Sequence, residues 1–208
     1  NTIVAATHVG PYKSVDGGDS WVSMNFPVED VCWSLIYAPG DSRTLYCGTV
    51  DTGVFVSSDG GQSWRQYAID EPDSVCKMGF PTRVIAVAQD TSDANSVYAA
   101  LEVGGLVSSS DGGQTWLDRN PPLIAFTEQD AYKSQLFSDT DTEGMLDSHA
   151  LATSAAAPGS VFLANRMGLF RSDNAGQDWR DLEIGRFSPL TYARDIIVSP
   201  HDPRILYA

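Results

Sequence analysis

The sequence predicts an all-β protein built from short antiparallel strands, and three observations support this prediction. First, the chain has 18 Gly and 11 Pro residues, a balance that favours many strands joined by turns. Second, 42% of the residues are hydrophobic and only 19% are charged, so the chain can bury a core. Third, one turn-like motif occurs four times, and internal repeats indicate a fold made of stacked similar units.

The repeated motif has the pattern Ser-x-Asp-x-Gly-x-Ser/Thr-Trp, and its last copy is degenerate because Asn174 replaces the aspartate. The closing tryptophans lie 43, 52 and 63 residues apart. A shared unit of about 43 residues with two insertions explains these spacings, and this is the length of one four-stranded propeller blade. The four copies occupy residues 14–21, 57–64, 109–116 and 172–179.

Each position of the motif has a structural reason. The Ser and Asp side chains accept hydrogen bonds from turn amides, and the glycines adopt the positive φ angles that tight hairpins require. The closing tryptophan is a large apolar anchor that fits between neighbouring sheets. We therefore interpret the motif as a hairpin staple and not as a ligand site.

A second repeated pattern places an aromatic residue inside a short apolar strand upstream of the motif, at Tyr46, Tyr98 and Phe162, and again at Tyr207. This pattern predicts the first two strands of each blade, with the motif between the third and fourth strands. We expect one incomplete β-propeller domain over 1–208, with six or seven blades when complete and four to five represented. The expected blades are 1–28 (partial), 29–70, 82–120, 146–185 and 190–208 (partial).

The motif and the strand pattern resemble the BNR/Asp-box propeller superfamily over essentially the whole chain. That group includes sialidases, xyloglucanases, sortilin-type receptors, photosystem assembly factors and uncharacterised bacterial single propellers. The tracts 171–173, 179–182 and 199–203 look most like the last of these. The resemblance implies the fold, while function depends on the site. Sialidases carry an Arg-Ile-Pro signature before the first motif, and residues 8–13 lack it. Xyloglucanases use two propellers, an arrangement that one incomplete propeller does not contain.

Charge and cysteine usage restrict the possible partners. The formal net charge of −14 disfavours nucleic acid and anionic membrane surfaces as partners. No segment approaches the ~20 apolar residues of a membrane span, and the first residues read as a strand and not as a signal segment. Three cysteines without a CxxC motif argue against a disulfide framework and favour a reducing, cytoplasmic compartment over secretion.

Topology predicts which face carries the site. If the motif lies between the third and fourth strands, then the loops between the second and third strands and the connections between blades lie on the opposite face. Both insertions, 65–82 and 117–148, fall in connections between blades. Elaborated loops are commonly binding loops, so we expect a protein partner, if there is one, to contact the 117–148 loop.

The loops of this opposite face supply the candidate site residues. As catalytic groups we expect carboxylates that could act as general acid and as base or nucleophile in glycoside cleavage; these are Asp51, Glu102 and Asp195. As ligand-binding groups we expect His8, Trp33, Arg83, His149, Arg166, Tyr192 and Arg194.

Two other interpretations stay open at this point. His8 and His149 could ligate a metal together with Asp51 or Glu102, but no fixed His-x-His spacing supports this, and we assign no metal or other cofactor. Alternatively, Arg83 or Arg194 pairs with a neighbouring carboxylate beside the channel. The predicted function is therefore binding of a small-molecule or carbohydrate ligand, with glycoside hydrolase-like chemistry left open. The alternative is a non-catalytic scaffold for a protein partner.

Overall fold

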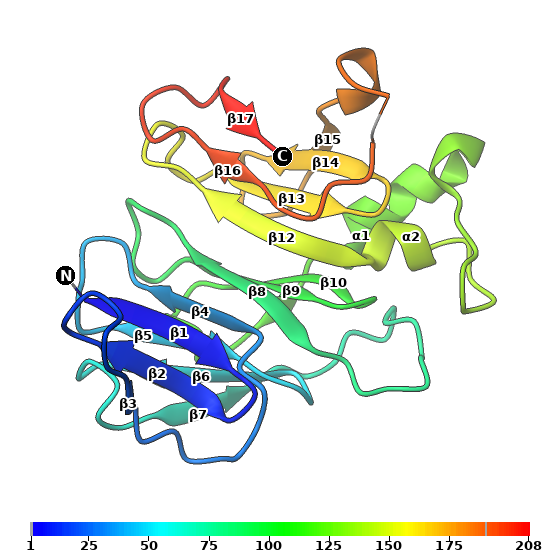
Figure 1. The fold of residues 1–208 in the computed structure, drawn as a ribbon. Helices are drawn as coiled ribbons and strands as arrows, with labels where there is room; N and C mark the ends of the chain where they lie inside the picture. Colours follow the sequence, from blue (N-terminus) through cyan, green and yellow to red (C-terminus); the bar gives the residue numbers. More distant parts are fainter. Residues whose placement is uncertain (1, 190) are drawn as a thin grey trace.

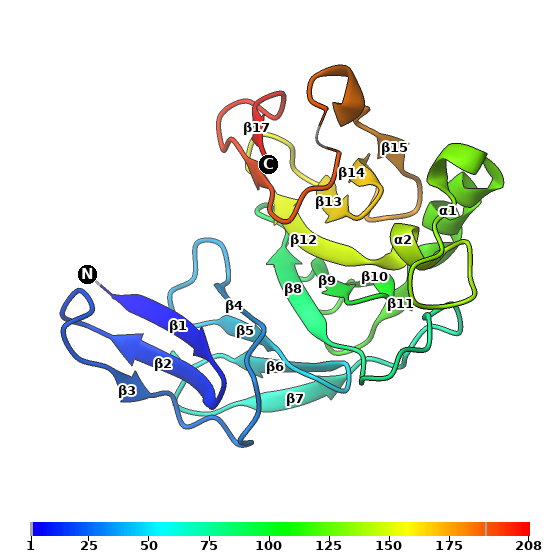
Figure 2. The same ribbon diagram turned by 45° about the vertical axis from the view of Figure 1, so that its right-hand side comes forward.

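The computed structural model describes residues 2–189 and 191–208, which form five antiparallel sheets placed side by side in an arc (Figure 1, Figure 2). The sheets follow one another in sequence order. Within every sheet, each strand pairs with its neighbour in the sequence. The predicted all-β propeller architecture is therefore confirmed as part of a propeller.

The first sheet has three strands, the next three have four, and the last has two. The first two sheets contain β1 (Ile3–Thr7), β2 (Gly10–Ser14) and β3 (Val22–Ser23), then β4 (Ser34–Tyr37), β5 (Leu45–Gly48), β6 (Gly53–Ser57) and β7 (Arg65–Ala68). The third contains β8 (Val84–Gln89), β9 (Val97–Leu101), β10 (Gly105–Ser109) and β11 (Leu117–Asp118). The fourth and fifth contain β12 (Ser148–Thr153), β13 (Val161–Asn165), β14 (Gly168–Ser172) and β15 (Arg180–Asp181), then β16 (Ile197–Val198) and β17 (Leu206–Tyr207).

The core lies between the sheets because successive side chains of a strand point to opposite faces. In β9, Val97, Ala99 and Leu101 pack towards the second sheet, whereas Tyr98 packs towards the fourth. In the same way, β13 directs Phe162 towards the fifth sheet and Leu163 towards the third. The strands β4, β8, β12 and β16 follow the inner side of the arc, where β8 contacts β4 and β12, and β12 contacts β16 (Figure 2).

The repeated motif forms the turns β2–β3, β6–β7, β10–β11 and β14–β15, and we call these the repeat turns. In the second repeat turn, Ser57 Oγ accepts from the Gly61 amide at 2.8 Å and donates to Asp59 Oδ1 at 2.8 Å. The Ser63 hydroxyl and amide donate to the same carboxylate at 2.6 and 3.0 Å. These hydrogen bonds, led by the one from the Ser63 side chain, hold the pKa of Asp59 well below its ordinary range. The predicted staple chemistry is confirmed.

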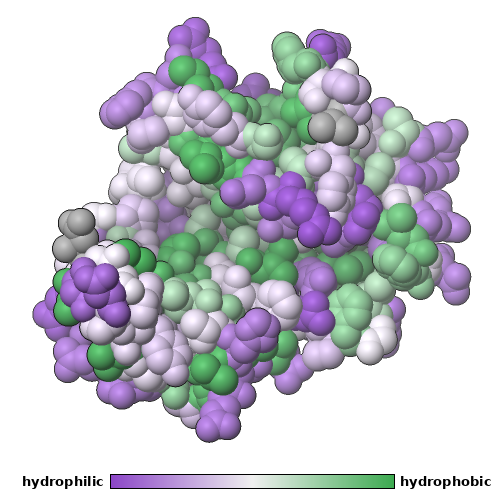
Figure 3. Space-filling model, in the orientation of Figure 1, coloured by the Kyte–Doolittle hydropathy of each residue, from purple (hydrophilic) through white to green (hydrophobic). Residues whose placement is uncertain are grey.

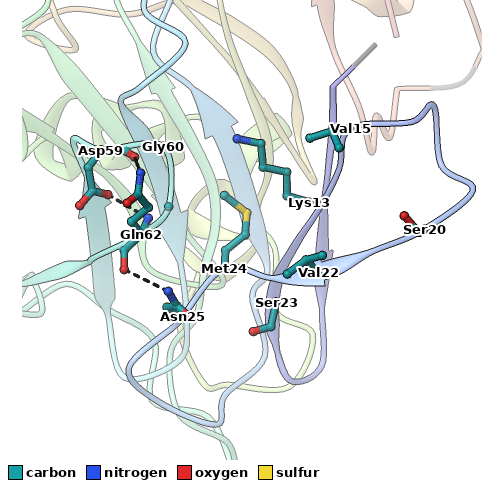
Figure 4. Close-up of a pocket in the computed structure, with 11 residues that line it drawn as sticks. Lys13, Val15, Ser20, Val22, Ser23, Met24, Asn25, Asp59, Gly60 and Gln62 are labelled. Carbon is teal, nitrogen blue, oxygen red and sulfur yellow. Dashed lines mark hydrogen bonds between the residues drawn. The ribbon is translucent and has the colours of Figure 1, made fainter.

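The repeat turns also connect neighbouring sheets. Trp64 Nε1 donates to the Met24 carbonyl at 2.7 Å, and Asn25 Nδ2 donates to the Gln62 carbonyl at 3.4 Å. Met24 extends into the groove between the first sheet and the second repeat turn (Figure 4). The closing tryptophan therefore reaches the preceding sheet, as the sequence predicts.

The insertion after β11 is folded. It contains α1 (Asn120–Ile124), two 3-10 turns (Ala125–Glu128 and Asp130–Tyr132) and α2 (Glu143–Leu146). A third 3-10 turn, Ile184–Arg186, follows β15. Leu123 and Met145 of the insertion pack into the core between the third and fourth sheets. Within the described residues, no helix combines the length and the apolar character needed to cross a membrane.

Candidate functional site

A shallow depression of about 230 Å³ opens where the third, fourth and fifth sheets meet, and we call it the rim depression. Its walls come from the starts of β8 and β12, from the turns β9–β10 and β13–β14, and from the segment leading into β16. These ends of the strands lie opposite the repeat turns, which join β10 to β11 and β14 to β15. The lining residues are Ile85, Glu102, Asp147, Ser148, His149, Arg166, Tyr192 and Arg194.

Two β-bulges place side chains in this depression. The pairing of β8 with β9 shifts between Val84 and Ala86, so Ile85 has no partner across the ladder. The pairing of β12 with β13 shifts in the same way around His149. A bulge redirects the extra residue of a strand, and both extra residues line the rim depression.

Asp147 is the central acceptor of the depression. Arg166 Nε donates to Asp147 Oδ2 at 2.7 Å, and His149 Nε2 lies 3.5 Å from the same oxygen. Burial of the Asp147 side chain opposes ionisation, but the hydrogen bonds from His149 and Arg166 outweigh it and lower the pKa of Asp147 below its ordinary value. The carboxylate is therefore ionised at neutral pH, with Arg166 and His149 beside its Oδ2.

Tyr192 connects the fourth sheet to the fifth. Its hydroxyl lies 3.4 Å from His149 Nε2 and accepts a hydrogen bond from Arg194 Nε at 3.2 Å. The guanidinium groups of Arg166 and Arg194 lie 5.0 and 5.5 Å from the centre of the Tyr192 ring. The other histidine nitrogen, Nδ1, lies 2.9 Å from the Ala193 carbonyl. Because a carbonyl only accepts, His149 Nδ1 is the donor in this contact.

A second cation flanks the depression on the side of the third sheet. Arg83 Nη1 donates to Glu102 Oε2 at 2.8 Å. The Arg83 guanidinium also lies 4.7 Å from the ring centre of Trp33 and 4.8 Å from that of Phe80. Arg83 therefore neutralises the one predicted catalytic carboxylate that lines the depression.

The electrostatic balance of this region differs from that of the chain. Three guanidiniums, those of Arg83, Arg166 and Arg194, lie in or beside the depression with two carboxylates, those of Glu102 and Asp147, so this group of five side chains carries a positive charge in a chain of net charge −14. Among the described residues, Arg194 forms no ion pair. In Figure 3, hydrophilic residues gather where the segment leading into β16 crosses β12.

The structure brings together most of the predicted ligand-binding residues. His149, Arg166, Tyr192 and Arg194 line the rim depression, and Trp33 and Arg83 adjoin it through the contact with Glu102. His8 lies exposed in the turn between β1 and β2 and is not part of the lining.

Of the three predicted catalytic carboxylates, only Glu102 lines the depression. Asp51 is exposed in the turn between β5 and β6, where its φ is 52°. Asp195 uses its Oδ1 to accept from the Ile196 amide at 2.8 Å. Residues 2–189 and 191–208 contain no group of three His, Cys, Asp or Glu side chains arranged to hold a metal ion.

Sequence analysis missed Asp147. It directly precedes β12 and lies two residues before His149, and a carboxylate at this spacing from a candidate histidine on a strand is the signal that could have identified it.

A groove of about 260 Å³ between the first sheet and the second repeat turn is a weaker candidate (Figure 4). Asp59, the carboxylate that lines it, already accepts hydrogen bonds on both oxygens within its own turn. The groove therefore offers no free acidic group.

Comparison with solved structures gives three informative similarities. An ancestral GH74 enzyme matches 96% of this chain at 19% identity with a TM-score of 0.65, and the match covers 25% of that enzyme. The GH74 xyloglucanase from Xanthomonas campestris matches 86% of the chain at 14% identity with a TM-score of 0.58, over 28% of its length. YCF48 bound to D1 peptide matches 96% at 17% identity with a TM-score of 0.57, over 55% of its length.

Because the identities are low, these similarities establish the fold alone. The chain spans between a quarter and about half of each matched protein. The protein-family models and the curated proteins contain no match to the sequence.

Proposed function

We propose that the chain is a binding propeller whose rim depression holds an anionic ligand, with a carboxylate as the recognised group. The observation that carries the proposal is Arg194, a guanidinium that lines the depression and forms no ion pair with any described residue. Arg166, its neighbour across the Tyr192 ring, is oriented by Asp147. Arginine presents a planar set of donors that matches a carboxylate.

The aromatic groups favour this ligand over a neutral sugar. Trp33 and Tyr192 are about 41% and 38% exposed, but guanidinium groups occupy the space beside their rings. Arg83 lies over the Trp33 ring, and both Arg166 and Arg194 lie against Tyr192. These rings hold guanidiniums in place, and such contacts leave the charge available to a ligand.

Glycoside hydrolysis has less support, although the GH74 enzymes share the fold. Glu102 and Asp147 both line the depression, so a carboxylate pair is present. However, Arg83 neutralises Glu102, while Arg166 and His149 engage Asp147. A general acid needs a raised pKa, whereas the pKa of Asp147 is lowered.

Matched ligand pairs test the proposal by calorimetric titration. One pair is a peptide with a free or an amidated C-terminus, chosen because YCF48 was solved with a peptide. The other is oligogalacturonate against xyloglucan oligosaccharide, the class named by the Xanthomonas enzyme. We expect at least one anionic member to bind ~10-fold or more tightly than its neutral match. Equal binding within both pairs, or no binding at all, contradicts the proposal.

Two variants locate the binding. Arg194→Gln is expected to abolish the preference for the anion, because it removes the unpaired charge. The matched control is Arg186→Gln, which removes a guanidinium that is exposed and paired with Glu183 outside the depression. An equal loss in both variants would mean that net charge, and not the site, controls binding.

A second candidate function is docking of a protein through the 117–148 loop. Phe137 is 81% exposed at the tip of this loop, although the segment around it is fixed. Glu143 is buried and accepts from the Phe137 and Ser138 amides at 2.9 and 2.6 Å and from the Ser138 hydroxyl at 2.6 Å. An exposed aromatic side chain on a backbone segment held by hydrogen bonds is typical of an interface anchor.

This second candidate predicts that Phe137→Ala weakens the binding of a protein ligand and leaves the binding of small anions unchanged. Phe187→Ala is the matched control, because Phe187 is 85% exposed outside this loop. A result in which both variants bind the protein ligand as the wild type does would exclude the loop as its docking site.

We also assign the repeat turns to the Asp-box class and residues 1–208 to one propeller domain. The Ser–Asp hydrogen bonds, the positive φ of the paired glycines and the closing tryptophan support the assignment. The fourth copy departs from the pattern in sequence but not in turn geometry, since Asn174 Oδ1 accepts from the Asp178 amide at 2.9 Å.

A further inference from the structure

Two of the three cysteines share one apolar cluster between the first and second sheets. Cys32 and Cys47 are both buried there and pack with Phe55. Cys47 lies in β5, and Cys32 lies just before β4 in the segment that links the two sheets. The cluster is closed by Phe26, Leu35 and Trp64.

Backbone hydrogen bonds fix the two segments that carry these cysteines beside one another. The Trp33 amide donates to the Gly48 carbonyl at 2.8 Å, so the residues directly after each cysteine are hydrogen-bonded to one another. On its other side, the Cys32 amide donates to the Thr7 carbonyl of β1 at 2.9 Å. A hydrogen bond with the Cys32 side chain, together with burial, raises the pKa of the Cys47 thiol. The two thiols therefore lie in one buried cluster, on hydrogen-bonded neighbouring segments of the chain.

The third cysteine is separate. Cys76 lies in the insertion after β7, where its thiol is 3.2 Å from the Thr140 hydroxyl, in a cluster with Val103 and Leu146. Cys76 is therefore an internal control for oxidation of Cys32 and Cys47.

We propose that Cys32 and Cys47 form an oxidisable pair that closes to an intramolecular disulfide inside the folded protein. With a low-molecular-weight disulfide as the oxidant, the Cys32 thiolate attacks one of its sulfurs and releases one thiolate. The Cys47 thiolate then displaces the second. One sulfur–sulfur bond breaks and one forms, and the two electrons and two protons of the cysteines leave in two small thiols. Cys32 reacts first because its side chain is slightly accessible, whereas that of Cys47 is completely buried.

The bond would have two structural effects. It would close a loop over residues 32–47 that contains β4, and the constraint would raise the melting temperature by about 5 °C. It would also restrain the backbone at Cys32, next to Trp33. The Trp33 ring contacts Arg83 beside the rim depression. Oxidation therefore modifies the protein beside its candidate site without requiring any ligand.

Peptide mapping tests the proposal directly. The native protein is incubated with oxidised glutathione, the remaining thiols are alkylated, and the protein is digested with trypsin under non-reducing conditions. Cleavage after Lys13, Arg43, Arg65 and Lys77 places each cysteine on a different peptide. We expect an intact mass lower by two hydrogens before alkylation, one linked pair of the 14–43 and 44–65 peptides, and an alkylated Cys76.

The same oxidation in urea verifies that the oxidant is active, and there we expect mixed pairings that include Cys76. A Cys76→Ala variant should keep the native link, and Cys47→Ala should lose it. The proposal is overturned if the native protein forms no link between Cys32 and Cys47 while the unfolded chain forms links, or if the native link includes Cys76. The mapping of the wild type needs no variant, so a variant that fails to fold leaves this test intact.

Discussion

The two faces of this propeller are built on different principles. On one face, the Ser and Asp side chains of a repeat turn find their partners within the turn: Ser57, Asp59 and Ser63 bond to one another and to amides of the same turn. On the other face, the rim depression combines single residues from three sheets, and Arg166, His149 and Tyr192 meet around Asp147. The repeated residues maintain the fold, and the unrepeated charges are the ones available for binding.

The degenerate fourth repeat turn shows how strongly the first face is constrained. Asn174 replaces the aspartate and Asp178 replaces the Ser or Thr. The acid and its partner have exchanged places, because Asn174 Nδ2 donates to Asp178 Oδ2 at 2.8 Å. Hydrogen-bond complementarity is kept although both residues changed.

The largest effect is expected from Gly61→Ala, which tests whether a repeat turn also locks two sheets together. Gly61 has φ +86°, and an alanine Cβ would displace the Cε end of the buried Met24 side chain and lie 3.3 Å from Met24 Cβ. Gly60→Ala is the matched control, since its φ is +80° but no atom lies near the added methyl. Chemical denaturation should give a loss of about 3 kcal/mol for Gly61→Ala and about 1 kcal/mol for Gly60→Ala. Equal losses would show that the intersheet contact contributes nothing.

The next effect concerns the hydrogen bonds inside one turn. Ser57→Ala removes the acceptor of the buried Gly61 amide and the donor to Asp59, and should lower the free energy of unfolding by about 2 kcal/mol. Ser58→Ala, at an exposed position in the same turn, should leave it within about 0.5 kcal/mol of the wild type. Neither change should alter ligand binding at the rim. A loss of binding in Ser57→Ala, measured where the protein is folded, would contradict the division between the two faces.

The fold was predictable because the repeats report the same local chemistry four times, and each copy fixes the position of a hairpin. The alternation of side chains along a strand is enough to predict that Val97 and Leu101 point to one face of the third sheet and Tyr98 to the other. The site was predictable only in part. Loop position correctly placed Arg166 and Tyr192 at one depression, but it also suggested Asp51 and Asp195, which do not line it.

The rest depended on features that a pattern of apolar residues does not encode. The bulge that directs His149 into the depression arises from a register shift between β12 and β13. Asp147 enters the site because α2 ends directly before β12, and α2 belongs to an insertion that has no counterpart in the other units. Unrepeated segments carry no internal comparison, so the sequence alone did not predict the bulge at His149 or the position of Asp147.

A smaller effect is expected at Asp147, and it depends on pH. The pKa of Asp147 is lowered in the folded state. Its contribution to the free energy of unfolding is therefore complete above pH 3.8, the ordinary pKa, and is lost as the pH falls through the lower pKa of the folded state. Asp147→Asn should therefore reduce the free energy of unfolding by about 1.5 kcal/mol at pH 6. The difference from the wild type should shrink below pH 4. The exposed Asp139→Asn is the control and should show no such dependence. A constant difference between pH 3 and 6 would mean that the Asp147 charge does not stabilise the fold.

The smallest effect on stability, and the sharpest test of function, is expected at Glu102. The Arg83–Glu102 pair is about one-quarter exposed, so Glu102→Gln should change the free energy of unfolding by only about 0.5 kcal/mol. The same change leaves Arg83 without a countercharge beside the rim depression, so the affinity for an anionic ligand should rise roughly 3- to 10-fold. A general acid or base in the same position would show one further effect, because its loss would abolish hydrolysis. Titration of the anionic ligand with Glu102→Gln and Arg194→Gln tests the binding role by sign, because binding at the rim depression requires the first variant to gain affinity and the second to lose it.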